Sequence, residues 1–484
     1  MRNRIVAAAA QVPQRTGVMI VFALAVPQLY LLPAGTIDIP LSTVAALALA
    51  PVVAARACRT PGSRLLRTAL VYSLLVLLLA RLAAFAWSPD PGDGRLPTML
   101  LVQFLVTLVL MDNAAREDPW LLYRAHYLLW PFVVAQSGLV AVFQLFPDVE
   151  DAYLRWVAGY FAGQNTVAGL FDVNRNNVLD PAKAGGVFVN GNVAGLFLGV
   201  CAMAAFAIWS VTRQRIVLIC GLVAYLGVWF TGSKACRVLA VVLPLAVVVA
   251  YYWQTRMTAR ARRLLLVAVG ATAVPAVLVV TLGDGGGFLG AVRTAFGQRT
   301  DIWGYAVEAF RDGPVLGLGW GGWFEGFADY ARRNDIYDDT FPPHNILLAA
   351  WASTGLLGLA ATIGFLVAEF RLVARAAAGG SPRNAMFVAW TGAAVAWVCI
   401  QAMGENTDVF GDIHTIPVIA LLLCFLAHPL PEEVRRVRQT ERRDSAPPAV
   451  PAVRDVHPGA GAGDAHVPSG LRRSGPSAAG AGRR

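Results

Sequence analysis

The stretch GGVFVNGNVAGLFLGVCAMAAFAIWS at residues 185–210 contains no charged side chain. A helix of about 20 predominantly apolar residues is long enough to cross the hydrocarbon core of a bilayer. Eleven further stretches of this kind lie at 17–34, 39–57, 66–88, 96–112, 127–146, 214–231, 235–253, 263–281, 345–370, 385–403 and 413–429. The sequence therefore predicts an all-α polytopic membrane protein with about twelve transmembrane helices.

Composition supports the same fold class. Apolar residues make up 57% of the chain and charged residues only 14%, whereas soluble domains are roughly 25% charged. The formal net charge is +10, but most arginines lie in short loops between apolar stretches or in the tail at 431–484, so we expect no nucleic-acid partner. The six cysteines show no CxxC spacing, and neither a disulfide framework nor a metal site is indicated.

Basic residues in short loops predict the orientation, because cytoplasmic loops are enriched in Lys and Arg. The outer loops at 35–38, 89–95 and 404–412 carry only Arg95. The loops predicted to be cytoplasmic carry Arg56, Arg59, Arg64, Arg67, Arg213, Arg215, Arg256, Arg260, Arg262, Arg263, Arg371, Arg375 and Arg383. We expect an inner-membrane protein with an uncleaved first helix and both termini in the cytoplasm.

Two outer loops are long, at 147–184 and 282–344. The aromatic residues of the first predict an amphipathic helix on the membrane surface; they are Tyr153, Trp156, Tyr160 and Phe161. The sequence of the second loop indicates a structured segment, and we expect the active site there. After residue 430, where the transmembrane domain ends, the composition at 431–484 predicts a disordered cytoplasmic tail.

Two short helices are expected within the 282–344 loop. Thr300 can cap the first, which Gly313-Pro314 then ends. Its predicted apolar face comprises Ile302, Trp303, Ala306 and Phe310. The second is expected at 323–333.

Cationic residues at three places are candidates for binding an anion. Arg81 lies inside the third apolar stretch, where it either faces an anion site or snorkels to the outer headgroups. Lys234 and Arg237 share a face at a helix start, which favours a phosphate; interfacial anchoring is the alternative. Arg299 also opens a helix, and its alternative is an ion pair with Asp301 or another loop acid.

His344 and Asn345 close the long outer loop directly after two prolines. Histidine is suited to general-base catalysis because its usual pKa of about 6.5 lies near neutrality. The alternative is that Asn345 is a helix cap beside an incidental histidine. The GxGxxG match at 317–322 has no βαβ unit around it, so we expect a tight turn there, and no Walker A motif is present.

Four ordered segments resemble the O-antigen ligase and polymerase superfamily of bacterial envelope proteins. These segments are Phe188-Val-Asn190-Gly-Asn192, Thr231-Gly-Ser233-Lys234, Arg299-x-x-x-Trp303 with Gly313-Pro-Val-Leu-Gly317-x-Gly319, and Pro343-His344-Asn345 with Gly355-Leu-Leu-Gly358. Lys234 stands where the family usually has Arg, and Lys cannot form a bidentate contact with phosphate. Arg237, one turn further on, is placed to compensate.

The resemblance implies a membrane-embedded, GT-C-type glycosyltransferase that is inverting and metal-independent and needs no cofactor. Such enzymes take a glycan from undecaprenyl pyrophosphate and pass it to a lipid, another glycan or a protein. Under this hypothesis Lys234, Arg237 and Arg299, with Arg81, stabilise the charge on the leaving pyrophosphate. His344 deprotonates or orients the acceptor hydroxyl. The expected substrate-orienting residues are Asn190, Asn192 and Asn345.

Three alternatives stay open at this point. A polysaccharide polymerase of the same superfamily would have the same sequence features as a ligase. A transporter of lipid-linked glycans predicts paired charges near mid-membrane, for which only Arg81, Gln103, Gln136 and Gln401 are candidates. The third alternative is a catalytically inactive scaffold or sensor.

Overall fold

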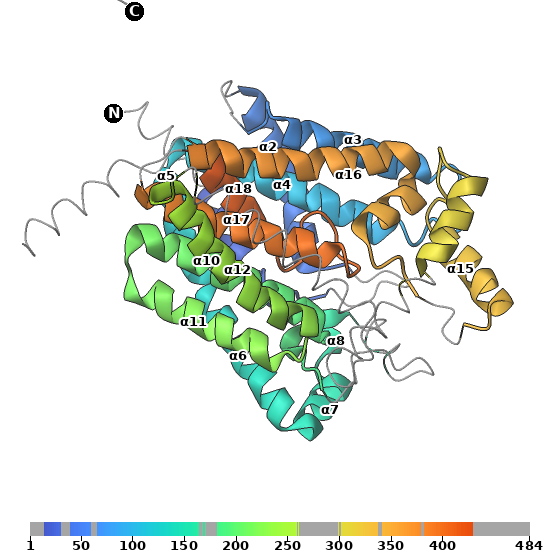
Figure 1. Cartoon of the computed structure of the whole chain (residues 1–484), viewed down its shortest axis with the longest axis horizontal. Coiled ribbons are helices and arrows are strands. Elements are labelled where there is room, and N and C mark those ends of the chain that lie inside the picture. The colour runs from blue at the N-terminus through green and yellow to red at the C-terminus, as the bar shows by residue number, and fades with distance from the viewer. Residues whose placement is uncertain are drawn as a thin grey trace, which may run out of the picture. The chain divides into compact units, whose positions relative to one another are not determined.

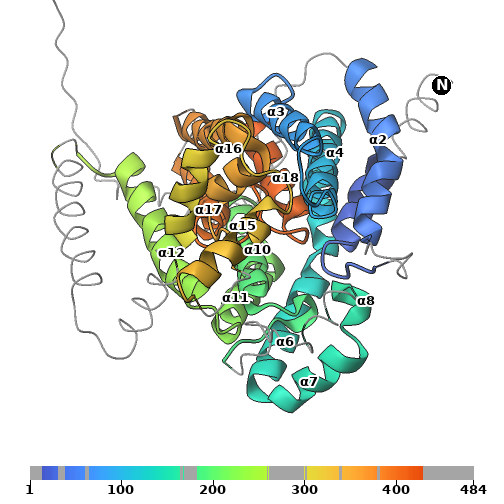
Figure 2. The same ribbon diagram turned by 90° about the vertical axis from the view of Figure 1, so that its right-hand side faces the viewer.

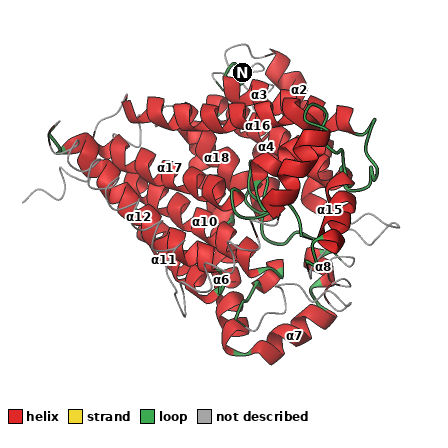
Figure 3. Ribbon diagram, turned by 45° about the vertical axis from the view of Figure 1, so that its right-hand side comes forward, coloured by secondary structure: helices red, strands yellow, loops and turns green. Residues whose placement is uncertain are grey.

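The computed structural model describes residues 14–30, 39–59, 65–163, 167, 170, 182–258, 260, 299, 302–336, 341–378 and 382–428. Within these ranges every regular element is a helix (Figure 3). The β contacts found there are two isolated bridges, Tyr30 with Pro40 and Asp408 with Gly411. The all-α prediction is therefore confirmed for the described residues.

The helices belong to one compact unit, Met1–Arg435. Residues 14–23 and 302–312 are helical as well. In chain order the others are α2 (Leu41–Arg59), α3 (Ala69–Ala84), α4 (Arg95–Glu117), α5 (Pro119–Ala125), η1 (His126–Leu128), α6 (Trp130–Leu145), α7 (Pro147–Trp156), α8 (Gly159–Ala162), η2 (Gly186–Phe188), α10 (Gly191–Thr212), α11 (Arg215–Phe230), α12 (Lys234–Thr255), α15 (Gly322–Arg333), α16 (Ile346–Ala378), α17 (Pro382–Ala402) and α18 (Ile416–Ala427).

Seven helical segments among the described residues are long and apolar enough to cross a membrane, and three shorter apolar helices, α3, α11 and α18, accompany them. These ten coincide with ten of the twelve predicted spans. The first predicted span, 17–34, is corrected: its helix ends at 23, ahead of Pro27, which disfavours helical backbone before it. The ninth, 263–281, lies outside the described residues, as does the tail at 431–484.

Helix α10 lies inside the bundle, against α11, α12 and α17 (Figure 2). Glycines on α10 allow this close packing, as small residues commonly do between membrane helices. A Cβ added at Gly199 would come within 2.2 Å of the Trp397 ring, and one at Gly195 within 2.5 Å of Cys236 Sγ. Helix α10 is therefore buried among other helices, which is consistent with its lack of charged side chains.

Several outer helices instead expose apolar side chains in rows. Leu75, Leu79 and Leu82 do so on α3, and Val241, Leu245 and Val248 do so on α12. Exposed apolar surfaces this extensive are rare on soluble monomers. They are the surfaces that lipid would cover in a polytopic membrane protein.

The described parts of the predicted outer loops meet at one end of the bundle, here called the loop end: residues 85–95, 146–163, 182–190, 302–336, 341–345 and 403–415. Helix α15 marks it in Figure 1. Contacts join these loops: Tyr153 Oη donates to Val187 O (3.2 Å), and Trp320 N donates to Ser88 Oγ (2.8 Å). The ends of α2 and α4 lie at the opposite end, where Arg56 Nη2 pairs with Glu117 Oε1 (2.6 Å).

Helix α16 is broken at Gly355, whose φ of 68° and ψ of −164° lie far from helical values. The break frees the Ala352 carbonyl, which accepts hydrogen bonds from Leu318 N (2.7 Å) and Gly319 N (3.1 Å). In return Leu356 N donates to Val315 O (2.9 Å). The 313–319 loop is therefore fixed in the break of α16, which holds the long outer loop over the start of that helix.

The two short helices of the long loop are found as predicted, with one correction. The first ends at 312, before Gly313-Pro314, and α15 forms the second. The buried face of 302–312 comprises Ile302, Tyr305, Ala306 and Ala309, whereas Trp303 and Phe310 are exposed. The face is rotated because Tyr305 packs against Trp323 and Phe327 of α15. Thr300 and Asp301 lie outside the described residues.

The turn that precedes α10 is held by α6 and α7. Gln136 Nε2 donates to Gly185 O (2.8 Å), and Gln136 Oε1 accepts from Val187 N (2.9 Å). Gly185 N donates to Glu150 Oε1 (3.3 Å). Burial raises the pKa of Glu150 to about 7, although the hydrogen bond from Gly185 opposes the rise.

Replacement of Glu150 with Gln is expected to stabilise the protein at high pH only. The folded state holds the Glu150 proton more tightly than the unfolded chain, so stability falls as the pH rises from about 4.5 through about 7. The thermal midpoint of Glu150→Gln in detergent should exceed that of the wild type at pH 8 and match it at pH 4.5. Asp148→Asn, exposed on the same helix, is the control. A variant midpoint at pH 8 no higher than wild type would contradict this account.

Candidate active site

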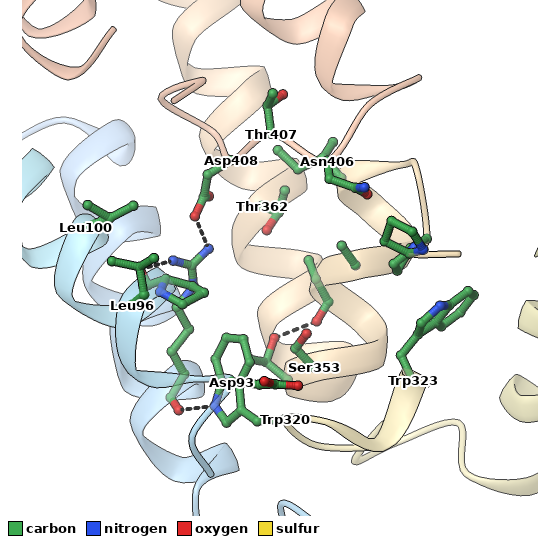
Figure 4. A pocket seen from close by; sticks show the side chains of 18 of the residues that line it. Asp93, Leu96, Leu100, Trp320, Trp323, Ser353, Thr362, Asn406, Thr407 and Asp408 are labelled. Carbon is green, nitrogen blue, oxygen red and sulfur yellow. Dashed lines mark hydrogen bonds and ion pairs between the residues drawn. The ribbon is translucent and has the colours of Figure 1, made fainter. Parts of the chain in front are cut away.

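A cavity of about 600 Å³ opens at the loop end, within the range of about 300–1,000 Å³ that small-molecule sites occupy. Its walls come from α3, the start of α4, the 319–324 and 342–354 segments, and the 405–412 loop (Figure 4). Trp320, Trp323 and Phe324 contribute aromatic surface, and Ser353, Thr362 and Thr407 contribute hydroxyl groups. Aromatic faces mixed with hydroxyl and amide groups suit a polyhydroxylated ligand such as a sugar.

Arg81 forms part of this wall and has a carboxylate partner. Its Nη2 lies 2.7 Å from Asp408 Oδ2, and its Nη1 donates to Pro97 O at 2.7 Å. Figure 4 shows Asp408 directed at the guanidinium. Trp320 Nε1 donates to the backbone oxygen of Arg81 (3.2 Å), which ties α3 to the long loop. The structure thus places Arg81 in a buried ion pair at the cavity wall.

Carboxylates outnumber cations around the cavity. Asp93, Glu405, Asp408 and Asp412 are among the described lining residues, and Arg81 is the cation among them. Burial, reinforced by the charge of Asp90, raises the pKa of Asp93. Because like charges repel most strongly where water is excluded, this cavity suits the neutral part of a substrate better than a phosphate.

Cations gather instead beside the turn at 403–406. Arg299 Nη2 donates to Gly404 O at 2.7 Å. Burial raises the pKa of Glu405, while Arg299, Lys183 and a hydrogen bond with the Asn192 side chain act in the opposite direction. Glu405 therefore interacts with two cations from separate parts of the chain. Because Glu405 also lines the cavity, the cations and the cavity adjoin one another.

His344 and Asn345 are attached to the same turn. His344 N donates to Asn406 Oδ1 (3.0 Å), and Asn345 Nδ2 donates to Met403 O (3.3 Å). Asn345 Oδ1 also caps α16, accepting from Leu347 N (2.9 Å) and Leu348 N (3.2 Å). The alternative prediction that Asn345 caps a helix is therefore confirmed. The cap fixes the neighbouring His344 at the start of α16.

Asn192 is fixed by a buried network behind the turn. Gln401 Nε2 donates to Asn192 O (2.9 Å), and Gln401 Oε1 accepts from Trp397 Nε1 (3.1 Å) and Cys236 Sγ (3.3 Å). These contacts join α10, α12 and α17. They fix the backbone of Asn192 at the start of α10.

The remaining predicted residues are placed differently. Asn190 Oδ1 caps α10 by accepting from Asn192 N (2.8 Å) and Val193 N (3.4 Å). Arg237 directs Nε (3.1 Å) and Nη2 (2.7 Å) to the Trp229 carbonyl at the end of α11. Lys234 is exposed at the first residue of α12. The contacts above bring Arg299, Asn192, His344 and Asn345 together, whereas Asn190 and Arg237 are engaged at helix ends.

Sequence reasoning missed Lys183 and Glu405. Lys183 packs beside the 231–233 turn: a Cβ added at Gly232 would come within 2.8 Å of Lys183 Cα. Lys183 gave no sequence signal. The 404–412 loop did give one, because this short connection between two spans carries Glu405, Asp408 and Asp412 and no basic residue.

Residues 185–363 match the family model for O-antigen ligase. This match includes Asn192, Arg299, His344 and Asn345, whereas Arg81 and the 403–406 turn lie outside it. No curated protein matches the chain significantly. The ordered motifs and the family match agree: over residues 185–363 the chain is similar to the O-antigen ligase family.

Proposed function

We propose that this protein is a glycosyltransferase of the cytoplasmic membrane, with both termini in the cytoplasm and the loop end outside. It transfers a glycan from undecaprenyl pyrophosphate to an acceptor hydroxyl. The observation that carries the proposal is the 403–406 turn: Arg299 donates to Gly404 O (2.7 Å), and the next residue, Glu405, lines the cavity. A transferase for a pyrophosphate-linked glycan needs both surfaces next to each other.

The cations supply the leaving-group side of the reaction. When the bond between the sugar and the pyrophosphate breaks, negative charge grows on the departing oxygen, and preorganised cations stabilise it. We assign this role to Arg299 and Lys183, and exposed Lys234 can reach a phosphate by its long side chain. The carboxylate-rich cavity then receives the sugars. This division follows from charge, because a pyrophosphate among four carboxylates would be repelled.

A ligase and a polymerase of the superfamily remain the two forms of this proposal. A transporter is less well supported, because each glutamine that could have marked a polar pathway has structural partners. Gln103 accepts from Thr43 Oγ1 (2.6 Å), Gln136 holds the 185–187 turn, and Gln401 holds Asn192. Arg81 and Asp408 are paired at the loop end rather than at mid-membrane.

The test uses purified full-length protein with an undecaprenyl-pyrophosphate-linked glycan from its host and candidate acceptors. Release of undecaprenyl pyrophosphate that depends on the acceptor supports the proposal. A labelled product shows whether the glycan was joined to a lipid, a protein or a growing glycan, and so separates ligase from polymerase. Movement of the lipid-linked glycan across proteoliposomes without release would contradict the proposal and favour a transporter.

Replacement of His344 with Ala is expected to lower kcat by about 10²-fold, as loss of a group that deprotonates or orients a nucleophile commonly does. The fold should persist, because the hydrogen bond to Asn406 comes from the His344 backbone. Steady-state kinetics at saturating donor and a thermal scan check both points. Wild-type turnover in the folded variant would remove His344 from the mechanism. Exposed Arg332→Ala serves as a control on the same loop.

A further inference from the structure

We propose that Glu405 is the base that accepts the proton of the acceptor hydroxyl. The inference rests on the proposed function and deepens it, because that proposal leaves open whether His344 deprotonates or only orients the acceptor. Glu405 lies in the turn between α17 and the bridge at Asp408–Gly411. It is outside the region that matches the family model.

The position of Glu405 meets the geometric requirement for this role. The anomeric carbon of the donor must lie between the departing pyrophosphate and the attacking hydroxyl, and the base must contact that hydroxyl. Glu405 interacts with Arg299 and Lys183 on the pyrophosphate side. It also lines the cavity on the sugar side. Asn192, whose backbone oxygen accepts from Gln401 Nε2 (2.9 Å), has a side chain that acts to lower the pKa of Glu405.

The other carboxylates of the cavity are engaged elsewhere. Asp408 Oδ2 pairs with Arg81, and its Oδ1 accepts from Val409 N (2.7 Å). Asp412 Oδ1 accepts from His414 N (3.2 Å). Asp93 lies two residues before α4, at a different wall of the cavity. Glu405 is thus the lining carboxylate that also adjoins the cations.

The environment of Glu405 couples its basicity to the donor. Burial raises the pKa of Glu405, and the two cations oppose this rise. When a pyrophosphate anion binds to Arg299 and Lys183, its negative charge offsets the effect by which these two cations lower the pKa of Glu405. The carboxylate then becomes a stronger base while the donor is bound, which limits proton removal to the complete complex.

The step balances in atoms and electrons. The acceptor O–H bond breaks and its proton goes to Glu405. The oxygen electron pair forms a new bond to the anomeric carbon as the bond from that carbon to the pyrophosphate oxygen breaks. Undecaprenyl pyrophosphate leaves with the electron pair, beside Arg299 and Lys183. The Glu405 proton then passes to water or to the released pyrophosphate, which restores the carboxylate.

The experiment measures kcat and the donor KM of full-length Glu405→Gln. The amide can still accept the hydrogen bond from Asn192 but cannot take a proton. We expect kcat to fall by about 10²–10⁴-fold with the donor KM changed less than about 3-fold. Glu405→Ala should regain part of its kcat with added formate, a small carboxylate that can replace the missing base. Glu325→Gln, exposed on α15, is the matched control.

Each outcome supports or overturns the inference. A kcat near wild type in Glu405→Gln overturns it. A rise confined to the donor KM also overturns it and makes Glu405 a residue that positions Arg299 and Lys183. If the other variants fail to fold, Glu405→Asp is the substitute, because it keeps the carboxylate. Retention of at least about a tenth of the wild-type kcat supports the proposal, whereas complete loss of activity in folded protein contradicts it. Failure of the wild type to transfer any glycan would refute the proposed function itself. This result differs from failure of the Glu405 assignment, in which the wild type is active.

Discussion

Arg299→Ala is expected to lower kcat by about 10²–10³-fold, the effect of removing one preorganised group that stabilises developing negative charge. Arg299 is held against the 403–406 turn by its hydrogen bond to Gly404 O. Its charge acts on Glu405 at the edge of the cavity. Loss of this cation removes stabilisation that matters most as the pyrophosphate departs, so the effect should fall mainly on kcat.

Arg299→Lys separates charge from geometry. Lys keeps the positive charge but cannot form two parallel hydrogen bonds with a phosphate, so we expect activity between that of Ala and that of the wild type. Arg333→Ala is the matched control, because Arg333 is an exposed arginine of the same loop that pairs with Glu308. Single-turnover release of undecaprenyl pyrophosphate is the measurement. Equal rates for Arg299→Ala and Arg333→Ala would show that Arg299 has no part in the chemistry.

Gly355→Ala is expected to destabilise the protein by several kcal/mol and to abolish transfer. The φ of 68° with a ψ of −164° belongs to a region that is accessible essentially to glycine alone. An added Cβ would lie 2.2 Å from Val315 O and 2.7 Å from Leu316 C. Both atoms belong to the backbone of the 313–319 loop, so the clash cannot be relieved by rotating a side chain. The loop must leave the break in α16.

Displacement of that loop should also reach the site, because α16 begins with the Asn345 cap. Gly138→Ala is the control: an added Cβ there meets nothing within 4 Å, and alanine is favoured over glycine inside a helix. Thermal unfolding in detergent should give a lower midpoint for Gly355→Ala and an unchanged or higher one for Gly138→Ala. Equal midpoints for Gly355→Ala and wild type would contradict the strained break.

The membrane helices were predictable because hydropathy is a local property. Helices α4, α10 and α12 lie where apolar stretches were found, and the Gly313-Pro314 pair ends a helix as expected. Their ends were less predictable. The break at Gly355 lies inside an apolar stretch and leaves hydropathy unchanged, and α18 is shorter than its apolar segment.

The site was predictable only in part, because its residues are joined by contacts between distant segments. Arg299, His344 and Asn345 were selected from their positions and from the family resemblance. The turn that joins them contributes the Met403 and Gly404 carbonyls, and a backbone carbonyl has no sequence signature. The Arg81–Asp408 pair spans 327 positions, so no local pattern indicated it. Glu405 was not predicted because it lies in the short 404–412 connection rather than in either long outer loop.

The most direct measurement is the stoichiometry of transfer by the purified protein reconstituted in liposomes. The account predicts one undecaprenyl pyrophosphate released for each new glycosidic bond to the acceptor, and neither product without acceptor. Release at the same rate without acceptor, or transport of intact lipid-linked glycan with no bond formed, would contradict the claim that the loop end is a glycosyltransferase site.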